Sequence, residues 1–411
     1  MKEWKSYKLG DIVKICSGLA YKADYLGHGD AILLGMGCVS FTDKFLKKGA
    51  RSYNGEIEDR FIVKPGDIVL ATRQQSDNLP ILGMPAIIPE EYQGKRLIAG
   101  SNLYIIRNES DIDNRFLYWL LKTPAYINHI SSCKTGTTVR MITKKDIESF
   151  EFACPGKEER NRISDFLWSI EDKIDLNNRI NHNLEEQAQA LYKSWFIDFE
   201  PFKDVKFVDS ELGMIPEGWH VGTLSELGDI IAGGTPSKAR ADYYTDNGIH
   251  WLTPKDLSNR CDKYTSRGEI DITELGYNNS SAKLMPRGSV LFSSRAPIGY
   301  ITIAKNDICT NQGFKSVIPK YAGTYYIYYW LSDNTDSIES QASGSTFKEA
   351  SGALMKCFPA LIPPKKILDS FEKRLEPLMH QQEILEEEIH NLSSMRDHLL
   401  PDLLSGVIAT H

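Results

Sequence analysis

The chain has 411 residues, a hydrophobic share of 41% and a formal net charge of −7. Its length suggests two to four domains, and no apolar run approaches the roughly 18 residues that mark a membrane-spanning helix. The first residues lack the apolar core of a signal peptide, and the seven cysteines form no C-x-x-C pair. We therefore expect no membrane association and a cytoplasmic protein with reduced thiols, without disulfides or a zinc site.

The negative charge is unevenly distributed along the chain. Residues 1–155 contain 21 Lys and Arg against 18 Asp and Glu, and residues 202–362 contain 16 against 18. The remaining segments, residues 156–201 and 363–411, are acidic, with 6 against 10 and 5 against 9. Net acidic charge disfavours a nucleic-acid partner, but most of it lies outside the two larger segments. Those segments can still bind DNA if their basic residues gather on one face.

Residues 1–155 are predicted to form an α+β domain. Leu-Gly-Asp-Ile at residues 9–12 lies near its start, and a glycine-marked turn leads into the apolar strand of residues 64–73. Aromatic residues at 116–121 indicate a helix, and a polar turn rich in threonine follows at residues 132–138. A proline closes the segment just before a change of pattern.

Residues 156–201 are predicted to contain a long amphipathic helix. Its seam residues recur at alternating steps of four and three, which is the heptad pattern of a coiled coil. The seam consists of Ile163, Leu167, Ile170, Ile174, Asn177, Asn181, Leu184, Ala188, Leu191 and Trp195. Acidic flanking residues, among them Glu171 and Glu185, are expected to face water. A helix of about 32 residues extends about 48 Å, so the seam needs a partner along its length.

Residues 202–362 repeat the features of the first domain in the same order, which predicts a second α+β domain. Leu-Gly-Asp-Ile recurs at residues 227–230, and a second glycine-marked strand covers residues 286–295. A second aromatic helix is expected at residues 325–331, and a second polar turn at residues 341–346.

Residues 363–411 carry a second seam, at a constant offset of 208 from the first. It consists of Phe371, Leu375, Leu378, Gln382, Leu385, Ile389, Leu392, Arg396, Leu399 and Leu403. The two helices are therefore predicted to pack antiparallel as an intramolecular coiled coil with a pseudo-two-fold axis. The alternative is that each helix serves only its own domain. Because proline disrupts a helix interior, we expect a short helix before Pro377 and the long helix to start near it.

The sequence contains no recognisable catalytic motif. A phosphate-binding G-x-x-x-x-G-K-[ST] loop is missing, as is the Asn-Pro-Pro-Tyr or Asp-Pro-Pro-Tyr tetrapeptide of a base-methylating site. The nine histidines form no H-x-x-x-H or H-E-x-x-H pair. We therefore expect no catalytic residue, cofactor or metal ligand in this chain.

Polar and basic side chains that could contact DNA occur at corresponding places in both domains. Direct readout needs such side chains to project from loops onto base edges, while others hold phosphates. The predicted DNA-binding residues are Arg73, Gln74, Gln75, Lys134, Thr135, Thr137, Thr138, Arg140, Ser293, Ser294, Arg295, Ser343, Ser345, Thr346 and Lys348. Each loop alone is better explained as an ordinary polar loop, but its recurrence in both domains favours DNA contact. The aromatic helices are assigned to the cores.

Four sequence stretches are specific when taken in order. They are the strands KPGDIVLATR and PRGSVLFSSR, then NLEEQAQALYKSWFIDFEP at the end of the first helix, and MRDHLLPDLLSG at the end of the second. With them, essentially the whole chain resembles the DNA-specificity subunit of type I restriction-modification systems. The resemblance implies two target-recognition domains, each reading one half of a bipartite site, with two conserved helices between them.

The resemblance also implies partners. Two modification subunits would supply methylation with S-adenosylmethionine, and restriction subunits would supply ATP- and Mg-dependent translocation and cleavage, so this chain would be non-catalytic. Candidate contacts with these partners are Trp195, Phe196, Leu399 and Leu400, unless these residues only cap the coiled coil.

Two other interpretations remain open. One is the specificity subunit of a related system in which methyltransferase and nuclease are fused in one partner chain. The other is a coiled-coil scaffold whose domains bind proteins instead of DNA.

Overall fold

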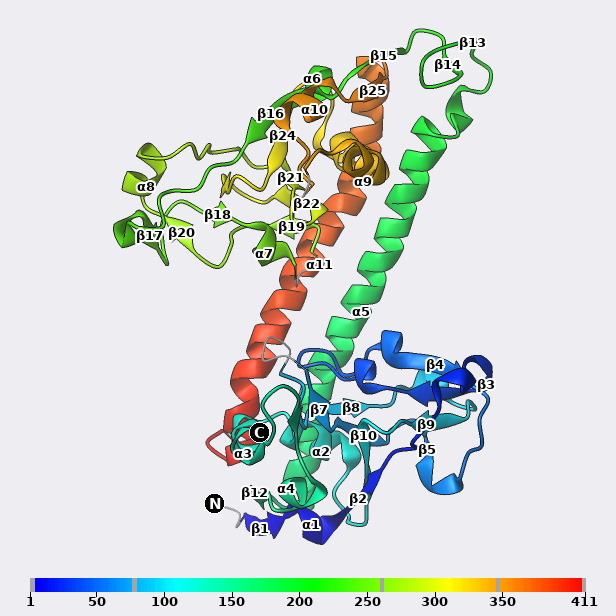
Figure 1. The fold of residues 1–411 in the computed structure, drawn as a ribbon, viewed down its shortest axis with the longest axis vertical. Coiled ribbons are helices and arrows are strands. Elements are labelled where there is room, and N and C mark those ends of the chain that lie inside the picture. Colours follow the sequence, from blue (N-terminus) through cyan, green and yellow to red (C-terminus); the bar gives the residue numbers. More distant parts are fainter. Residues whose placement is uncertain (1–3, 76–79, 259–261, 345–347, 409–411) are drawn as a thin grey trace. The chain divides into compact units, whose positions relative to one another are not determined.

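The computed structural model describes residues 4–75, 80–258, 262–344 and 348–408. Contacts divide the chain into two units. Unit 1 comprises Met1–Ile174 and Asn391–His411, and unit 2 comprises Asp175–His390. The boundary falls within both long helices, α5 (Lys157–Phe196) and α11 (Lys365–Ser405). Each unit therefore combines one α+β domain with a portion of each helix (Figure 1).

Two four-stranded sheets form the domain of unit 1. The first has the order β2-β10-β6-β8 with antiparallel neighbours, and the second the order β4-β3-β9-β5. The strands are β1 (Lys5–Lys8), β2 (Val13–Ser17), β3 (Leu26–Leu34), β4 (Ala50–Tyr53), β5 (Ile62–Val63), β6 (Ile68–Ala71), β7 (Arg73–Gln74), β8 (Pro85–Ile87), β9 (Leu97–Ala99), β10 (Leu103–Asn108), β11 (Arg140–Met141) and β12 (Glu151–Cys154). The helices are α1 (Leu9–Ile12), α2 (Asn114–Leu120), α3 (Pro124–Cys133) and α4 (Lys144–Glu148).

A five-stranded sheet of order β16-β24-β21-β22-β19 forms the centre of unit 2. The strands of this unit are β13 (Phe207–Val208), β14 (Ile215–Pro216), β15 (His220–Thr223), β16 (Gly228–Ala232), β17 (Tyr244–Thr245), β18 (Trp251–Leu252), β19 (Tyr264–Thr265), β20 (Asp271–Ile272), β21 (Val290–Ser294), β22 (Ile298–Ala304), β23 (Cys309–Thr310), β24 (Lys315–Pro319) and β25 (Pro359–Ile362). The helices are α6 (Leu224–Leu227), α7 (Pro254–Leu257), α8 (Glu274–Asn278), α9 (Thr324–Gln341) and α10 (Gly352–Cys357).

The glycine-marked strands β6 and β21 are buried in the two units as the sequence repeat predicts. Each follows a turn whose glycine has positive φ, +81° at Gly66 and +85° at Gly288, a conformation that other residues adopt only with strain. Every residue of β6 and β21 is buried. The turn therefore requires glycine for backbone reasons, and the strand that follows is apolar because it lies inside the domain.

The opening motif is equivalent in the two units with a shift of three residues. The Leu9 N–H donates to the Phe150 carbonyl at 2.8 Å, and the Leu224 N–H donates to the Phe358 carbonyl at 3.0 Å. The structural equivalent of Leu9 is therefore Leu224, not the Leu227 of the second Leu-Gly-Asp-Ile. A capping box between Thr223 and Glu226 fixes the start of α6 at Leu224, which the short sequence match did not detect.

The two long helices pack antiparallel within each unit, as the seams predict. In unit 2 the Asn177 amide donates to Glu388 at 2.9 Å, and the Gln382 amide donates to the Asn181 carbonyl at 3.1 Å. Polar seam residues of both helices thus form hydrogen bonds across the helix pair, with Glu388 from beside the second seam as one partner.

In unit 1 a buried ion pair joins the two helices. Arg396 lies 2.6 Å from Glu171, and their side chains are 8% and 5% exposed. Glu171 therefore does not face water, contrary to expectation, because the arginine in the second seam requires a partner.

Helix α11 continues through Pro377, so the predicted break is wrong. Proline removes the N–H that would bond to the Lys373 carbonyl. Both residues are exposed, so water can satisfy that carbonyl. Phe371, Leu375 and Met379, on either side of the proline, are fully buried in the core of unit 2. Burial of this apolar face therefore maintains the helix despite one missing hydrogen bond.

Candidate nucleic-acid interface

In unit 1 the two predicted DNA-binding loops lie side by side. Strand β7 follows β6 directly and pairs with β11, which closes the polar turn. The register places Met141 opposite Arg73 and Arg140 opposite Gln74, and Thr135 bridges back to Met141. Residues about 65 apart in sequence therefore form one surface.

In unit 2 the same arrangement is formed by single β-bridges instead of a pair of strands. Glu349 bridges both Arg295 and Ser343, as Met141 bridges Arg73 and Thr135. The Ala350 N–H donates to the Ser294 carbonyl at 2.9 Å. In unit 1 the Ile142 N–H donates to the Thr72 carbonyl at 3.3 Å. The hydrogen bonds therefore make Arg73 and Arg295 equivalent, and likewise Met141 and Glu349.

Most of the predicted DNA-binding side chains are accessible. Those exposed are Arg73, Gln75, Lys134, Thr135, Thr137, Thr138, Ser343 and Lys348, whereas Arg140 and Arg295 are half-buried. Arg140 also donates to the Gly136 carbonyl across its turn. Ser345 and Thr346 lie outside the described residues. The accessible set carries basic and hydroxyl groups suited to phosphates and base edges, and its contacts with DNA stay a prediction.

Three predicted contacts are assigned a structural role instead. Gln74 is buried and its Oε1 accepts from the Leu82 N–H at 3.2 Å. Ser293 is fully buried, donating to the Pro297 carbonyl at 2.9 Å and accepting from the Tyr300 N–H at 2.8 Å. Ser294, also fully buried, donates to the Gly313 carbonyl at 3.1 Å. Side chains bonded inside the domain offer no accessible edge to a base.

Three of the four predicted partner contacts are also corrected. Trp195 and Phe196 are 9% and 3% exposed, and both rings pack on Phe371, with centroids 5.8 and 4.8 Å apart. Leu400 is 5% exposed in the core of unit 1, and Leu399 packs against the same core. Trp195, Phe196 and Leu400 therefore belong to the cores of their units, whereas Leu399 is half-buried and stays a predicted partner contact.

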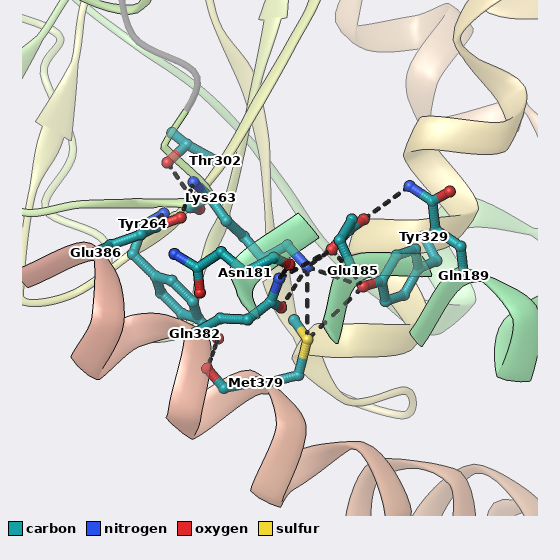
Figure 2. Close-up of polar contacts among 10 residues, drawn as sticks. All are labelled: Asn181, Glu185, Gln189, Lys263, Tyr264, Thr302, Tyr329, Met379, Gln382 and Glu386. Carbon is teal, nitrogen blue, oxygen red and sulfur yellow. Dashed lines mark hydrogen bonds and ion pairs between the residues drawn. The ribbon is translucent and has the colours of Figure 1, made fainter. Parts of the chain in front are cut away.

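A polar cluster around Lys263 joins the unit 2 domain to its helices (Figure 2). The Lys263 ammonium is 6% exposed and contacts Glu185 of α5, Gln382 of α11 at 2.9 Å and the Tyr329 hydroxyl at 2.8 Å. Burial opposes ionisation of Glu185, but Lys263 lowers its pKa overall. Glu386 accepts the Lys263 N–H at 2.8 Å.

This cluster was not predicted. The flanking acids had been expected to face water, and only the fold places Lys263 opposite them. The signal available in the sequence was the recurrence of acidic residues beside both seams.

Among the described residues, no group of three or more His, Cys, Asp or Glu side chains could hold a metal ion. Over the same residues, no helix is both long and apolar enough to cross a membrane.

The fold matches a solved specificity subunit. Over 98% of this chain and 96% of the other, it superposes on the S subunit of the type I restriction-modification system of M. genitalium, with a TM-score of 0.60 and 14% identity. The architecture is therefore that of a protein with two α+β domains and two long helices.

The sequence comparisons identify the family. The model of the type I restriction modification DNA specificity domain matches residues 1–186 and 216–392, so the chain belongs to this family. It is 25% identical to the HindI specificity subunit of Haemophilus influenzae over 99% of this chain and all of that protein. It is 38% identical to the MjaIX specificity subunit of Methanocaldococcus jannaschii over 44% of each. It is thus a DNA-recognising, non-catalytic specificity subunit.

Proposed function

We propose that this chain reads a bipartite DNA site, with one half read by each unit. The observation that carries the proposal is the repeated β-bridging of an arginine to a polar turn, once at Arg73 in β7 and once at Arg295 just after β21. The two surfaces share their backbone geometry but differ in side chains. Equivalent scaffolds with different side chains are suited to reading two different short sequences.

The proposed partners are two modification subunits and restriction subunits of a type I complex in the cytoplasm. S-adenosylmethionine, ATP and Mg would bind in those partners. The chain offers two copies of one architecture, which supports two equivalent docking positions. Because Trp195, Phe196 and Leu400 are buried, docking would use exposed residues instead. Native mass spectrometry should show two modification subunits per chain at saturation, and a single one would overturn the stoichiometry.

The decisive experiment is to map methylated bases in the genome of a host that carries this chain with its partners. The proposal expects one motif with two specific halves separated by unspecified bases. A single uninterrupted motif, or methylation without sequence preference, would overturn it.

Co-purification would show whether methyltransferase and nuclease are separate or fused. A protein scaffold predicts binding that is indifferent to DNA and without the salt dependence of phosphate contacts.

A further inference from the structure

The two proposed recognition surfaces differ in charge at equivalent positions. In unit 2, Glu349 forms two ion pairs. Arg295 Nη1 lies 3.5 Å from Glu349 Oε2, and Lys315 Nζ lies 3.1 Å from Glu349 Oε1. In unit 1, the residue opposite the equivalent Arg73 is Met141, whose side chain is apolar and exposed. Among the described residues, the position beside the arginine therefore carries a carboxylate in unit 2 and a methionine in unit 1.

The third member of the group differs as well. Lys315 follows Phe314, which bridges Ser293 near the end of β21. At the same place in unit 1, Tyr104 follows Leu103, which pairs with Ala71 at the end of β6. Unit 2 thus has the combination Arg, Glu and Lys where unit 1 has Arg, Met and Tyr.

The contacts around Glu349 hold its carboxylate in place. Lys315 is 8% exposed and also lies 3.4 Å from the Ser294 hydroxyl, which is fully buried. The side chains of Glu349 and Arg295 are 38% and 36% exposed. The lysine therefore anchors the carboxylate from inside the domain, while the arginine on its other oxygen remains accessible.

A carboxylate at a DNA-binding surface has a cost, because it repels phosphates and cancels an attractive charge. It also has a use. An unpaired arginine is drawn to any nearby phosphate, whereas a paired one is held in a narrower range of orientations and binds with a smaller loss of freedom. Because the guanidinium has five N–H donors, one ion pair leaves donors for a base edge.

We propose that Glu349 is a positioning residue for the second half-site: held by Lys315, it orients Arg295 toward a base edge and away from phosphate. The inference rests on the proposed function of unit 2 as a reader of one half-site. It predicts that recognition of the second half-site depends on a carboxylate whose equivalent position in unit 1 is occupied by Met141.

The test is Glu349→Gln in the full chain assembled with its modification subunits, with DNA duplexes carrying the site mapped by methylation. Each half-site is scrambled in turn, and the Kd ratio between intact and scrambled duplex is measured. The variant should lose about tenfold or more of its discrimination at the second half-site, consistent with one good base contact. Discrimination at the first half-site should not change. Binding to unrelated DNA should tighten, and its salt dependence should steepen by about one released counterion.

Glu269→Gln is the matched control for charge, because Glu269 is an exposed acid of unit 2 paired with Lys255 at 3.1 Å. It should leave both half-site ratios unchanged. A second variant, Lys315→Tyr with Glu349→Met, installs the unit 1 residues. It removes the buried lysine together with the glutamate that pairs with it. It should lose discrimination at the second half-site while keeping the thermal midpoint close to that of the unmodified chain.

Two results would overturn the role of Glu349. One is unchanged discrimination at the second half-site in a folded Glu349→Gln protein or in the double variant. The other is a parallel loss at both half-sites with a lower thermal midpoint, which indicates a purely structural role. If the unmodified complex itself shows no preference for either half-site, the proposed function fails instead, so the two failures are distinguishable.

Discussion

Arginine is the side chain through which each proposed surface is best able to distinguish bases. Its planar fork matches the two acceptors of guanine, whereas the threonines of the polar turns suit several bases and the phosphates. Arg73 is exposed beside Met141, and Arg295 is half-buried beside Glu349. The two arginines therefore occupy equivalent positions but have different neighbours.

We expect Arg73→Ala to weaken recognition of the first half-site by about 1–3 kcal/mol, the range of a good bidentate base contact. Arg295→Ala should do the same at the second half-site only. The measurement is the Kd for duplexes with one half-site altered at a time. If both arginines contact phosphate, binding should fall evenly across sequences with a shallower salt slope. A lowered thermal midpoint in both variants would point to a structural role.

We expect two buried glutamates to make the stability of unit 2 depend on pH. Burial raises the pKa of Glu372 and of Glu386 to about 7, above the value of about 4.3 in an unfolded chain. Between these values the folded protein binds more protons than the unfolded one, so the free energy of unfolding should fall as pH rises from about 4.5 to 7.

The measurement is urea unfolding at a series of pH values. Glu372→Gln and Glu386→Gln keep an oxygen that can accept the N–H groups of Tyr326 and Lys263, bonded at 2.8 Å each, but remove the titration. The double variant should therefore show a flatter profile between pH 4.5 and 7. An unchanged slope would assign the pH dependence to other groups.

Among the elements, the long helices and the strands that recur in both units were the ones the sequence could predict. The seams of α5 and α11 repeat over many residues, so their signals add. The short strands β6 and β21 were predictable because each follows a glycine-marked turn at the same place in its unit. Pro377 was misjudged because its effect depends on whether the helix face at the proline is exposed. The burial of Ser293 and Ser294 was missed because serine next to a strand end is common both in loops and in cores. Neither property is local in sequence.

Removing Pro377 tests how much tertiary packing stabilises α11. Pro377→Ala restores the N–H to the Lys373 carbonyl at an exposed position, so we expect a gain of about 1–3 kcal/mol, up to the difference in helix propensity. Part of this gain is offset, because removing the proline also increases the conformational entropy of the unfolded chain. Glu376→Ala, at the exposed neighbouring position, is the control and should change stability by less than about 0.5 kcal/mol. Denaturant unfolding of the full chain measures both, and a destabilised Pro377→Ala protein would contradict the explanation.

At the scale of the whole molecule, one sequence plan occurs twice, and the boundary between the two units falls inside both long helices. The repeat itself was predictable from sequence, because order and spacing of motifs survive where individual residues differ. Which accessible side chains read which bases was not predictable, because readout depends on the positions of loops to within a fraction of the size of a base.

We expect the helices to determine the spacing between the two half-sites and not the bases read. Inserting one heptad into α5 after Ile174, and a matching heptad into α11 before Asn391, preserves the heptad register of the pair. Seven helical residues add about 10.5 Å and turn the chain by nearly two full turns. At about 3.4 Å per base pair, the spacer in the methylated motif should lengthen by up to about three base pairs, with both half-site sequences unchanged.

A heptad in α5 alone is the control for this experiment, because it leaves the helices mismatched by two turns and should reduce both assembly and site recognition. Methylation mapping of the doubly extended chain gives the decisive result. An unchanged spacer would mean that partner subunits set the distance between half-sites. Altered half-site sequences would mean that the helices influence base readout directly, through the domain contacts that Lys263 makes with Glu185 and Gln382.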